Sequence, residues 1–413
     1  SKVFVYFNGN HNDLEVAIRE GIAQVYLQSM LFGSNFQEIV QNAILLHLPE
    51  WFEKGLISFA GQEWSTGIDN RMRDIFIHET YDNFEDFADR EPELAGHAMW
   101  YYIFQNYGKS TVSNLLYLTR INRSEESGFL YVLGNRLESI ATACMQYYEE
   151  RYTNELQLRD SLPSDPVGVK NRKSLPLTAF ALSPSGQQLA YVTNEIGRVK
   201  VFVHDVATGD RKTLFKTGFR NAFQSTDYNY PHLAWKPIGQ ELGIVYEKKD
   251  QIYLLEINLK TGERKRSLIP NQYYRIYSFQ YLDNFNAALS ASVDGYSDLF
   301  LYRTNTRQST RLTQDYYDDL DATAVQLDGQ PGLLFASNRP EADLTPARLD
   351  TTRPTGTFDL YYLSLQIDDQ GQREIVRITH TPAADERHPV PVDSTWYSYL
   401  SNQAGVSNRA YGF

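Results

Sequence analysis

Repeated turns in the second half of the sequence restrict the fold more than any other feature. The stretch Ser183–Gly186 (Ser-Pro-Ser-Gly) recurs 53 residues later as Lys236–Gly239, and Asp205–Gly209 recurs at the same offset as Asn258–Gly262. Short apolar strands such as Gln188–Val192 lie between these turns. Repeats of this length, with short strands between turns, are typical of β-propellers, in which each unit is a four-stranded blade.

Three further units continue the pattern through Asn286–Tyr302, Gly332–Leu363 and Trp396–Gly405. Too few residues follow the last of these for a final strand, so the repeat predicts about five blades over residues 175–413, the fifth incomplete. An incomplete blade leaves an open strand edge. We therefore expect either further chain or another chain to complete the ring.

Residues 1–155 have a different pattern. A short β-strand is expected at residues 2–7, and the apolar spacing becomes helical from Asn12 onward. Ser34, Ser110 and Ser124 are suitable helix N-caps. The helices are expected near residues 13–31, 35–47, 50–64, 67–78, 83–90, 93–107, 109–121, 124–132 and 136–155.

Residues 156–174 are polar and contain two prolines, which is typical of a linker. The predicted fold class is therefore a multidomain α + β chain, with an all-helical domain over residues 1–155 followed by a β-propeller over residues 175–413.

Within the helical part, the stretch Leu48–Leu56 reads Leu-Pro-Glu-Trp-Phe-Glu-Lys-Gly-Leu. It resembles a helix of the gluzincin metallopeptidases with a peptidase MA-like domain, where the glutamate at the position of Glu53 is the third zinc ligand. The stretches Gly96–Gly108 and Val132–Tyr152 are similar to later helices of that family. The resemblance covers roughly residues 1–152 and implies a peptidase-like helical fold.

The zinc motif of that family is absent. Its His-Glu-x-x-His places two imidazoles on one helical face, whereas the matching residues here are Arg19-Glu20-Gly21-Ile22-Ala23. The degenerate metal-site positions are thus Arg19, Glu20, Ala23 and Glu53. The resemblance implies a pseudopeptidase with neither metal nor cofactor. We further hypothesise that Arg19 pairs with Glu53 in place of the zinc ion, so that Glu53→Ala would destabilise the domain.

The repeats of the second half resemble the WD40-like blades of TolB-like propellers, whose signature is Ser-Pro-x-Gly, an apolar strand, a Ser-Asn-Arg turn and Asp-x-x-Thr-Gly. This resemblance implies a non-catalytic scaffold that binds a protein or peptide. It also implies a place in the periplasm or at the outer membrane, in a cell-envelope assembly for secretion, motility or transport.

Composition restricts the partner and the chemistry. The formal charge of −12 and the absence of a Lys/Arg cluster argue against nucleic acid as a partner. No uninterrupted apolar stretch is long enough to cross a membrane. Cys144, the single cysteine, excludes an intrachain disulfide and is expected to be a buried, inert thiol. The start at Ser1, without Met, predicts a processed or shortened N-terminus.

Several side chains are candidates for contacts. The inserted loop expected at residues 340–357 is one such region. Aspartates at positions 315, 318, 319 and 321 could bind calcium but lack EF-hand spacing, which favours a solvated turn. The candidate protein contacts, which could instead pack between blades, are Tyr228, Tyr230, Tyr273, Tyr274, Tyr316 and Tyr317.

Two enzyme classes are alternatives to a binding protein. A zinc metallopeptidase with an atypical site would need ligands such as His78, His97 or Glu93, although a lone histidine beside an acid is usually a surface pair. A serine hydrolase with a propeller gate would need a Gly-x-Ser-x-Gly elbow, which the sequence lacks.

Overall fold

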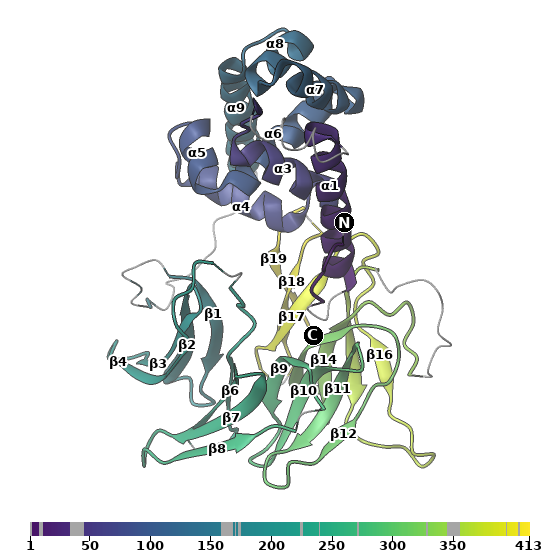
Figure 1. Ribbon diagram of the computed structural model, residues 1–413. Helices are drawn as coiled ribbons and strands as arrows, with labels where there is room; N and C mark the ends of the chain where they lie inside the picture. Colours follow the sequence, from purple (N-terminus) through teal and green to yellow (C-terminus); the bar gives the residue numbers. More distant parts are fainter. Residues whose placement is uncertain are drawn as a thin grey trace. The chain divides into compact units, whose positions relative to one another are not determined.

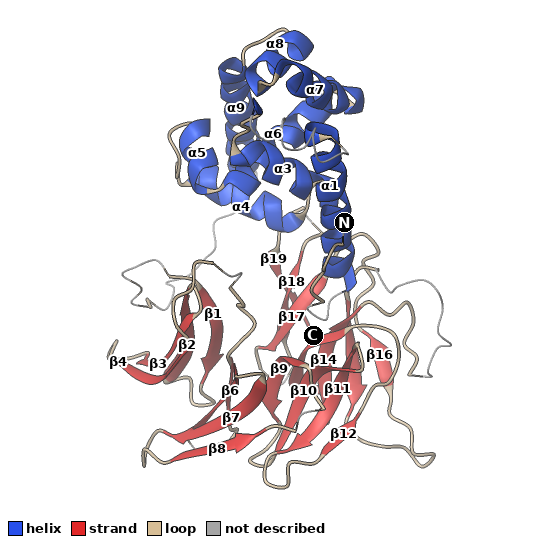
Figure 2. Cartoon of the chain, viewed as in Figure 1, coloured by secondary structure: helices blue, strands red, loops and turns tan. Residues whose placement is uncertain are grey.

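The computed structural model describes residues 2–7, 11–33, 45–157, 168–169, 171, 175–223, 226–238, 240–270, 272–327, 329–344, 356–393, 395–403 and 405–413. The chain divides into two compact units, one built around Ser1–Leu162 and the other around Pro163–Gln403 with Asn408–Phe413. The described helices belong to the first unit and the strands to the second (Figure 2). The α + β fold class is confirmed.

Helices form where the period of 3.6 residues predicted them. Ser124 is an N-cap as expected, since its Oγ accepts a hydrogen bond from the backbone N–H of Ser127 at 3.2 Å. The described helices are α1 (His11–Phe32), α3 (Glu50–Gly61), α4 (Thr66–Ile77), α5 (Phe84–Arg90), α6 (Pro92–Tyr107), α7 (Lys109–Asn122), α8 (Glu125–Leu133) and α9 (Leu137–Gln157). Most of the helix expected at 35–47, including its cap Ser34, lies outside the described residues.

Two local predictions are wrong. Residues 2–7 are not a strand, because no strand pairs with them; Val3 instead packs against α1 at Gly21, where a Cβ atom would lie 2.4 Å from Val3 Cγ1. Ser110 is not an N-cap, because α7 begins one residue earlier. Gly108, with φ of 85°, ends α6 and precedes α7.

The core of the helical unit depends on a close crossing of α3 and α6. A Cβ atom on Gly96 would lie 1.9 Å from the carbonyl oxygen of Trp51, and one on Gly55 would lie 2.2 Å from the backbone of Gly96. The side chain of Trp100 is buried at this crossing and donates a hydrogen bond to the carbonyl of Phe52 at 3.0 Å. Gly55 and Gly96 therefore have a packing role.

The second unit consists of five antiparallel sheets in which strands consecutive in sequence pair with each other, as the repeat predicted. The first four have four strands each: β1 (Leu177–Leu182), β2 (Gln188–Glu195), β3 (Arg198–Asp205) and β4 (Arg211–Thr217); β5 (His232–Trp235), β6 (Glu241–Lys248), β7 (Gln251–Asn258) and β8 (Arg264–Leu268); β9 (Arg275–Tyr281), β10 (Asn286–Val293), β11 (Tyr296–Arg303) and β12 (Ser309–Arg311); β13 (Asp319–Leu327), β14 (Gln330–Ser337), β15 (Asp359–Ser364) and β16 (Ile375–Arg377).

The fifth sheet has three described strands, β17 (Glu386–Pro391), β18 (Tyr397–Ser401) and β19 (Asn408–Gly412). Part of the loop expected at 340–357 and most of the linker expected at 156–174 lie outside the described residues.

The sheets are the five blades of a propeller (Figure 1). Their first strands are neighbours in order: β1 with β5, β5 with β9, β9 with β13, and β13 with β17. Buried apolar side chains fill the space between successive blades. Trp235 Nε1, for example, donates to the carbonyl of Ala181 at 2.9 Å and so joins blade 2 to blade 1. Among the described residues, no comparable packing joins blade 5 to blade 1.

No helix among the described residues combines the length and the apolar character needed to cross a bilayer.

Candidate functional site

The degenerate metal-site positions do not form the expected ion pair. Arg19 lies on the surface of α1, with 57% of its side chain exposed, and binds Glu15 one turn earlier on the same helix. Among the described residues Arg19 makes no salt bridge with Glu53. The hypothesis that Arg19 replaces the zinc ion is therefore wrong, because a nearer carboxylate on its own helix binds it.

Glu20, Ala23 and Glu53 are each partly buried. Burial raises the pKa of Glu53, and burial together with the nearby Glu93 raises the pKa of Glu20. Glu20 packs over Gly61 at the end of α3, where a Cβ atom would lie 2.5 Å from Glu20 Cγ. The carboxylates of Glu20 and Glu53 are not among the groups of described residues that could share a metal ion.

A pocket of about 520 Å³ does lie beside Glu20, and His97 is part of its wall. His97 Nδ1 is 3.0 Å from Ser58 Oγ and its Nε2 is 2.8 Å from the carbonyl oxygen of Glu63. Burial lowers the pKa of His97 to about 4, so the ring is neutral at pH 7. His78 is exposed and pairs with Asp74. His97 therefore has a structural role, and His78 belongs to a surface pair.

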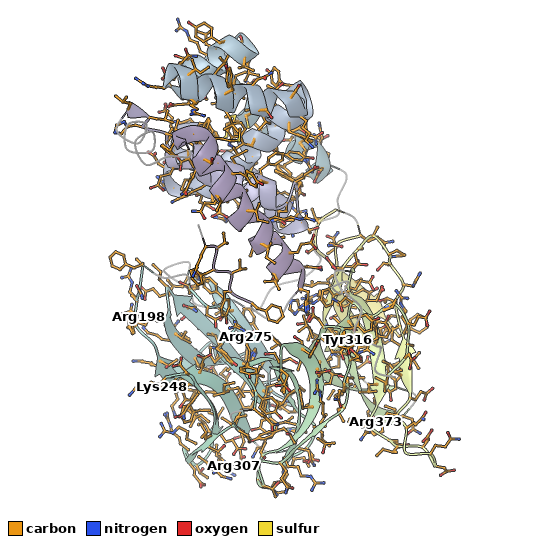
Figure 3. All side chains as sticks on the ribbon, turned by 45° about the vertical axis from the view of Figure 1, so that its right-hand side comes forward. Arg198, Lys248, Arg275, Arg307, Tyr316 and Arg373 are labelled. Carbon is orange, nitrogen blue, oxygen red and sulfur yellow. The ribbon has the colours of Figure 1, made fainter. Side chains whose placement is uncertain are left out.

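The six candidate tyrosines divide into three groups. Tyr230 and Tyr273 are buried, which removes them as protein contacts, and the Tyr230 hydroxyl accepts a hydrogen bond from the backbone of Ile276. Tyr316, labelled in Figure 3, and Tyr317 are partly buried. Tyr228 and Tyr274 are exposed.

The four aspartates are not in a solvated turn. Asp315, Asp318 and Asp319 are buried, and Asp321 is largely so. Asp319 accepts two hydrogen bonds of 2.7 Å from Arg339 Nη2. The prediction of a solvated turn is wrong because Asp319 and Asp321 lie in β13, and Asp315 and Asp318, which precede it, are buried.

Arg339 is the centre of this buried charge. Its Nη2 lies 3.0 Å from Asp315 as well as 2.7 Å from Asp319, and its side chain has no exposed surface. Asp298 of blade 3 pairs with Arg311 and lies within 4.8 Å of Asp315 and Asp319, counting one carboxylate oxygen from each. The three carboxylates could hold a metal by distance alone, but two guanidinium groups already bind them.

The group around Arg339 contains three carboxylates and only two guanidinium groups, and this excess of carboxylates raises two of their pKa values. Burial and the nearby Asp319 raise the pKa of Asp298 to about 7, outweighing Arg311. Burial and Asp319 also raise the pKa of Asp315 to about 6. Three carboxylates and two guanidinium groups therefore approach neutrality by binding a proton.

A cavity of the propeller lies between the first strands of the blades. It has a volume of about 960 Å³, and residues of β1, β5, β9, β13 and β17 all line it. We call this cavity the channel. Phe180 and Leu182 of β1 and Val390 of β17 line it with more than half of their surface exposed, as does Val392 just after β17. The channel thus offers apolar surface to a ligand.

Bulges direct polar side chains at one end of the channel. Four of the five first strands shift register near their beginnings, each with one extra residue, and the extra positions include Thr178, Tyr277, Asp321 and His388. All four residues line the channel. Asp321 and His388 have left-handed backbones, with φ of 57° and 52°. Bulges and such backbones are common beside functional sites.

The bulges of β13 and β17 bring three charged residues together. Asp321 Oδ2 accepts hydrogen bonds from Arg387 Nε at 2.5 Å and from the backbone N–H of His388 at 3.2 Å. Asp321 Oδ1 lies 3.2 Å from His388 Nδ1. The Arg387 guanidinium also stacks 4.6 Å over the ring of Phe358. We call Asp321, Arg387 and His388 the Asp321 cluster.

The contacts within the Asp321 cluster stabilise the charged forms of Asp321 and His388. Burial alone would raise the pKa of Asp321, but Arg387 and His388 lower it well below its usual range. The charge of Asp321 raises the pKa of His388. Across the channel on β5, His232 donates from Nε2 to the carbonyl of Ile276 at 2.8 Å, and burial lowers its pKa to about 4. Arg275, labelled in Figure 3, is held by Asp227 at 2.6 Å.

Sequence reasoning proposed Asp321 only as a calcium ligand and missed Arg387 and His388. One signal was available: Pro389 and Pro391 cannot donate to a strand ladder, so a strand that contains them is an edge strand. The first strands of propeller blades are edges facing the channel. This pattern could have placed His388 at the channel wall.

Comparisons with known proteins give structural similarity only. No protein-family model matches the sequence, and no curated protein matches it. TolB from Acinetobacter baumannii is similar at 16% identity and a TM-score of 0.42, over 57% of this chain and 51% of that one. A putative TolB from Agrobacterium tumefaciens is similar at 16% identity and a TM-score of 0.35, over 48% of this chain and 64% of that one.

The β-propeller domain of the Trilobed protease from Pyrococcus furiosus is similar at 13% identity and a TM-score of 0.38, over 57% of this chain and 67% of that one. The chain therefore spans about half to two thirds of these structures. The assignment of a propeller rests on the strand order and pairing described above.

Proposed function

We propose that this protein is a non-catalytic binding protein of a bacterial cell-envelope assembly, and that its propeller channel receives a segment of a protein partner. The observation that carries the proposal is the channel itself, to which all five blades contribute. Exposed apolar side chains and a few fixed polar groups in one cavity are the usual composition of a binding site.

The absence of catalysis is supported by the sequence and by the neighbourhood of His97. Arg19-Glu20-Gly21-Ile22-Ala23 provides no histidine pair for zinc. Both ring nitrogens of His97 are engaged by protein groups. The envelope location is supported by the blade motifs that resemble TolB-like propellers.

Site-specific photo-crosslinking tests the binding role. A benzophenone side chain is introduced at Leu182 or Val390 in the channel, with Lys265 on β8 as a control of similar exposure outside it. We expect irradiation of cells that produce the protein to give one partner band from both channel positions and none from Lys265. Channel positions that give no band, or the same band from Lys265, would contradict the proposal.

Metal analysis tests the alternative, a zinc metallopeptidase with an atypical site. We expect purified protein to contain substoichiometric zinc and to cleave no peptide with or without added zinc. Stoichiometric zinc with chelator-sensitive cleavage would establish the metallopeptidase instead. The pocket beside Glu20 would then be the place to search for ligands.

A further inference from the structure

The Asp321 cluster offers a ligand little acceptor surface, because only 10% of the Asp321 side chain is exposed and both of its oxygens are engaged. Of the two carboxylate oxygens, Oδ2 binds Arg387 and the backbone of His388, and Oδ1 faces His388 Nδ1. A positively charged ligand group would have to displace one of these contacts, which belong to a buried ion pair and are costly to break.

The cluster does have a free donor. His388 uses Nδ1 toward Asp321, while 60% of its side chain is exposed and no hydrogen bond to its Nε2 is found among the described residues. Two cations, Arg387 and protonated His388, share one carboxylate, so the cluster carries a net charge of about +1 when His388 is protonated. Apart from tyrosines, the described channel residues that ionise are Asp321, His232 and His388, and His232 is neutral.

We propose that the channel binds a partner segment in which a carboxylate lies next to apolar residues, with the carboxylate accepting a charge-assisted hydrogen bond from His388. This inference rests on the function proposed above and names the chemistry of the partner. Phe180, Leu182, Val390 and Val392 supply the apolar surface that the neighbouring residues of the segment contact.

The chain's formal charge of −12 limits what the cluster can do at long range. Charges separated by more than a Debye length of about 10 Å are largely screened. The cluster therefore selects and orients the segment at close range and does not attract it from a distance.

Three peptide libraries test the inference on the full chain. Each contains fluorescent nonapeptides, acetylated and amidated at the ends, with Val, Leu, Phe and Ser mixed at every position except the centre. The centre is Glu, Gln or Lys. Because a charge-assisted hydrogen bond is roughly twice as strong as a neutral one, we expect the Glu library to bind about tenfold more tightly than the Gln library, and the Lys library to bind least.

Substitutions of His388 test whether this residue causes the preference for the Glu library over the Gln library. His388→Gln should remove the advantage of Glu over Gln, and His388→Lys should retain most of it. His78→Gln is the matched control, because His78 and Asp74 form a pair of the same 3.2 Å length on the surface of the helical unit. Circular dichroism confirms that each variant is folded.

The pH dependence should follow the protonation of His388, which faces Asp321 from β13 and Arg387 from its own strand. As pH rises from 6 to 8.5, the Glu library should lose its advantage while the affinity of the Gln library stays constant.

Two results would overturn the inference: equal binding of the Glu and Lys libraries by the wild type, or an unchanged preference for Glu in His388→Gln. Absence of binding by every library would also contradict it. If the crosslinks from Leu182 and Val390 still report a partner, only the carboxylate anchor fails. If those crosslinks fail as well, the proposed function fails with it.

Discussion

Two glutamates of the helical unit, Glu20 and Glu53, differ from two aspartates of the propeller, Asp298 and Asp319. All four carboxylates are at least partly buried, but among the described residues only the aspartates form a salt bridge. The glutamates are partly buried and keep part of their hydration. The aspartates have no exposed surface. The comparison shows that depth of burial decides whether a carboxylate requires a partner, since a fully desolvated charge is stable only when it is paired.

The role that we expected of Arg19 in the helical unit belongs to another arginine in the propeller. We hypothesised that Arg19 substitutes for the zinc ion by pairing with Glu53, and Arg19 instead lies at the surface. In the propeller, Arg339 does form such pairs, with Asp315 and Asp319. Four predictions test this contrast between the units, in order of decreasing effect.

Arg339→Met should have the largest effect. It leaves Asp315 and Asp319 buried without a cation, which costs about 3–5 kcal/mol of unfolding free energy. Urea unfolding of the β-sheet signal measures this. Arg19→Met is the control and should change stability by less than about 0.5 kcal/mol, since it loses one exposed pair. Equal effects of the two substitutions would show that the comparison is wrong.

Gly96→Ala should destabilise the helical unit through packing and not through charge. The added methyl group would lie 1.9 Å from the carbonyl oxygen of Trp51, and overpacking of this kind costs about 1–3 kcal/mol. Gly67→Ala on α4 is the matched control, with its nearest neighbour at 3.8 Å, and should be neutral or stabilising. Thermal unfolding of the helical signal separates the two. A loss that salt reverses would indicate an electrostatic cause instead.

The propeller should lose stability as pH rises from 5.5 to 8. The pKa of Asp298 is raised to about 7 in the folded state, so its contribution is complete below the unfolded value of about 4 and disappears as pH passes 7. The slope for one proton is at most about 1.4 kcal/mol per pH unit. Asp298→Asn should flatten the curve obtained by urea unfolding, leaving the falling contributions of Asp315 and His388 and, below pH 6.5, the opposing rise from His232, whose pKa is lowered to about 4. A slope unchanged by Asp298→Asn would exclude Asp298 as its source.

Glu53→Gln should have the smallest effect and the opposite sign. Burial raises the pKa of Glu53, so the folded state disfavours its charge, and the neutral amide should stabilise the helical unit by a few tenths of a kcal/mol at pH 7. This reverses the loss expected when Glu53 was thought to pair with Arg19. Differential scanning calorimetry of the wild type and the variant at pH 7 and pH 4.5 should show the difference at the higher pH only.

The helices and the propeller blades could be predicted from the sequence. A period of 3.6 residues located the helices, and the repeat offset of 53 residues located the blades, because both patterns record which side chains face a core. The burial of Cys144, at 2% exposure, followed from the same reasoning, and burial raises the pKa of its thiol.

The Asp321 cluster could not be predicted in this way. Asp321 and His388 are 67 positions apart and meet only because β13 and β17 each gain one residue in their ladders. A bulge depends on pairing across strands, and no local pattern in the sequence records it. Likewise, the choice of Arg19 between Glu15 and Glu53 depends on how α1 packs against α3.

Each bulge frees one position from the ladder that holds its blade together. Thr178, Tyr277, Asp321 and His388 therefore have no directly opposite residue on the neighbouring strand, and exchanging one of them removes no pair from the ladder. Two of them already form a cross-blade cluster, whereas the hydroxyl of Thr178 has no hydrogen-bond partner among the described residues. A scaffold of this kind can acquire a new ligand one blade at a time, and related chains could diverge in what they bind while keeping the same architecture.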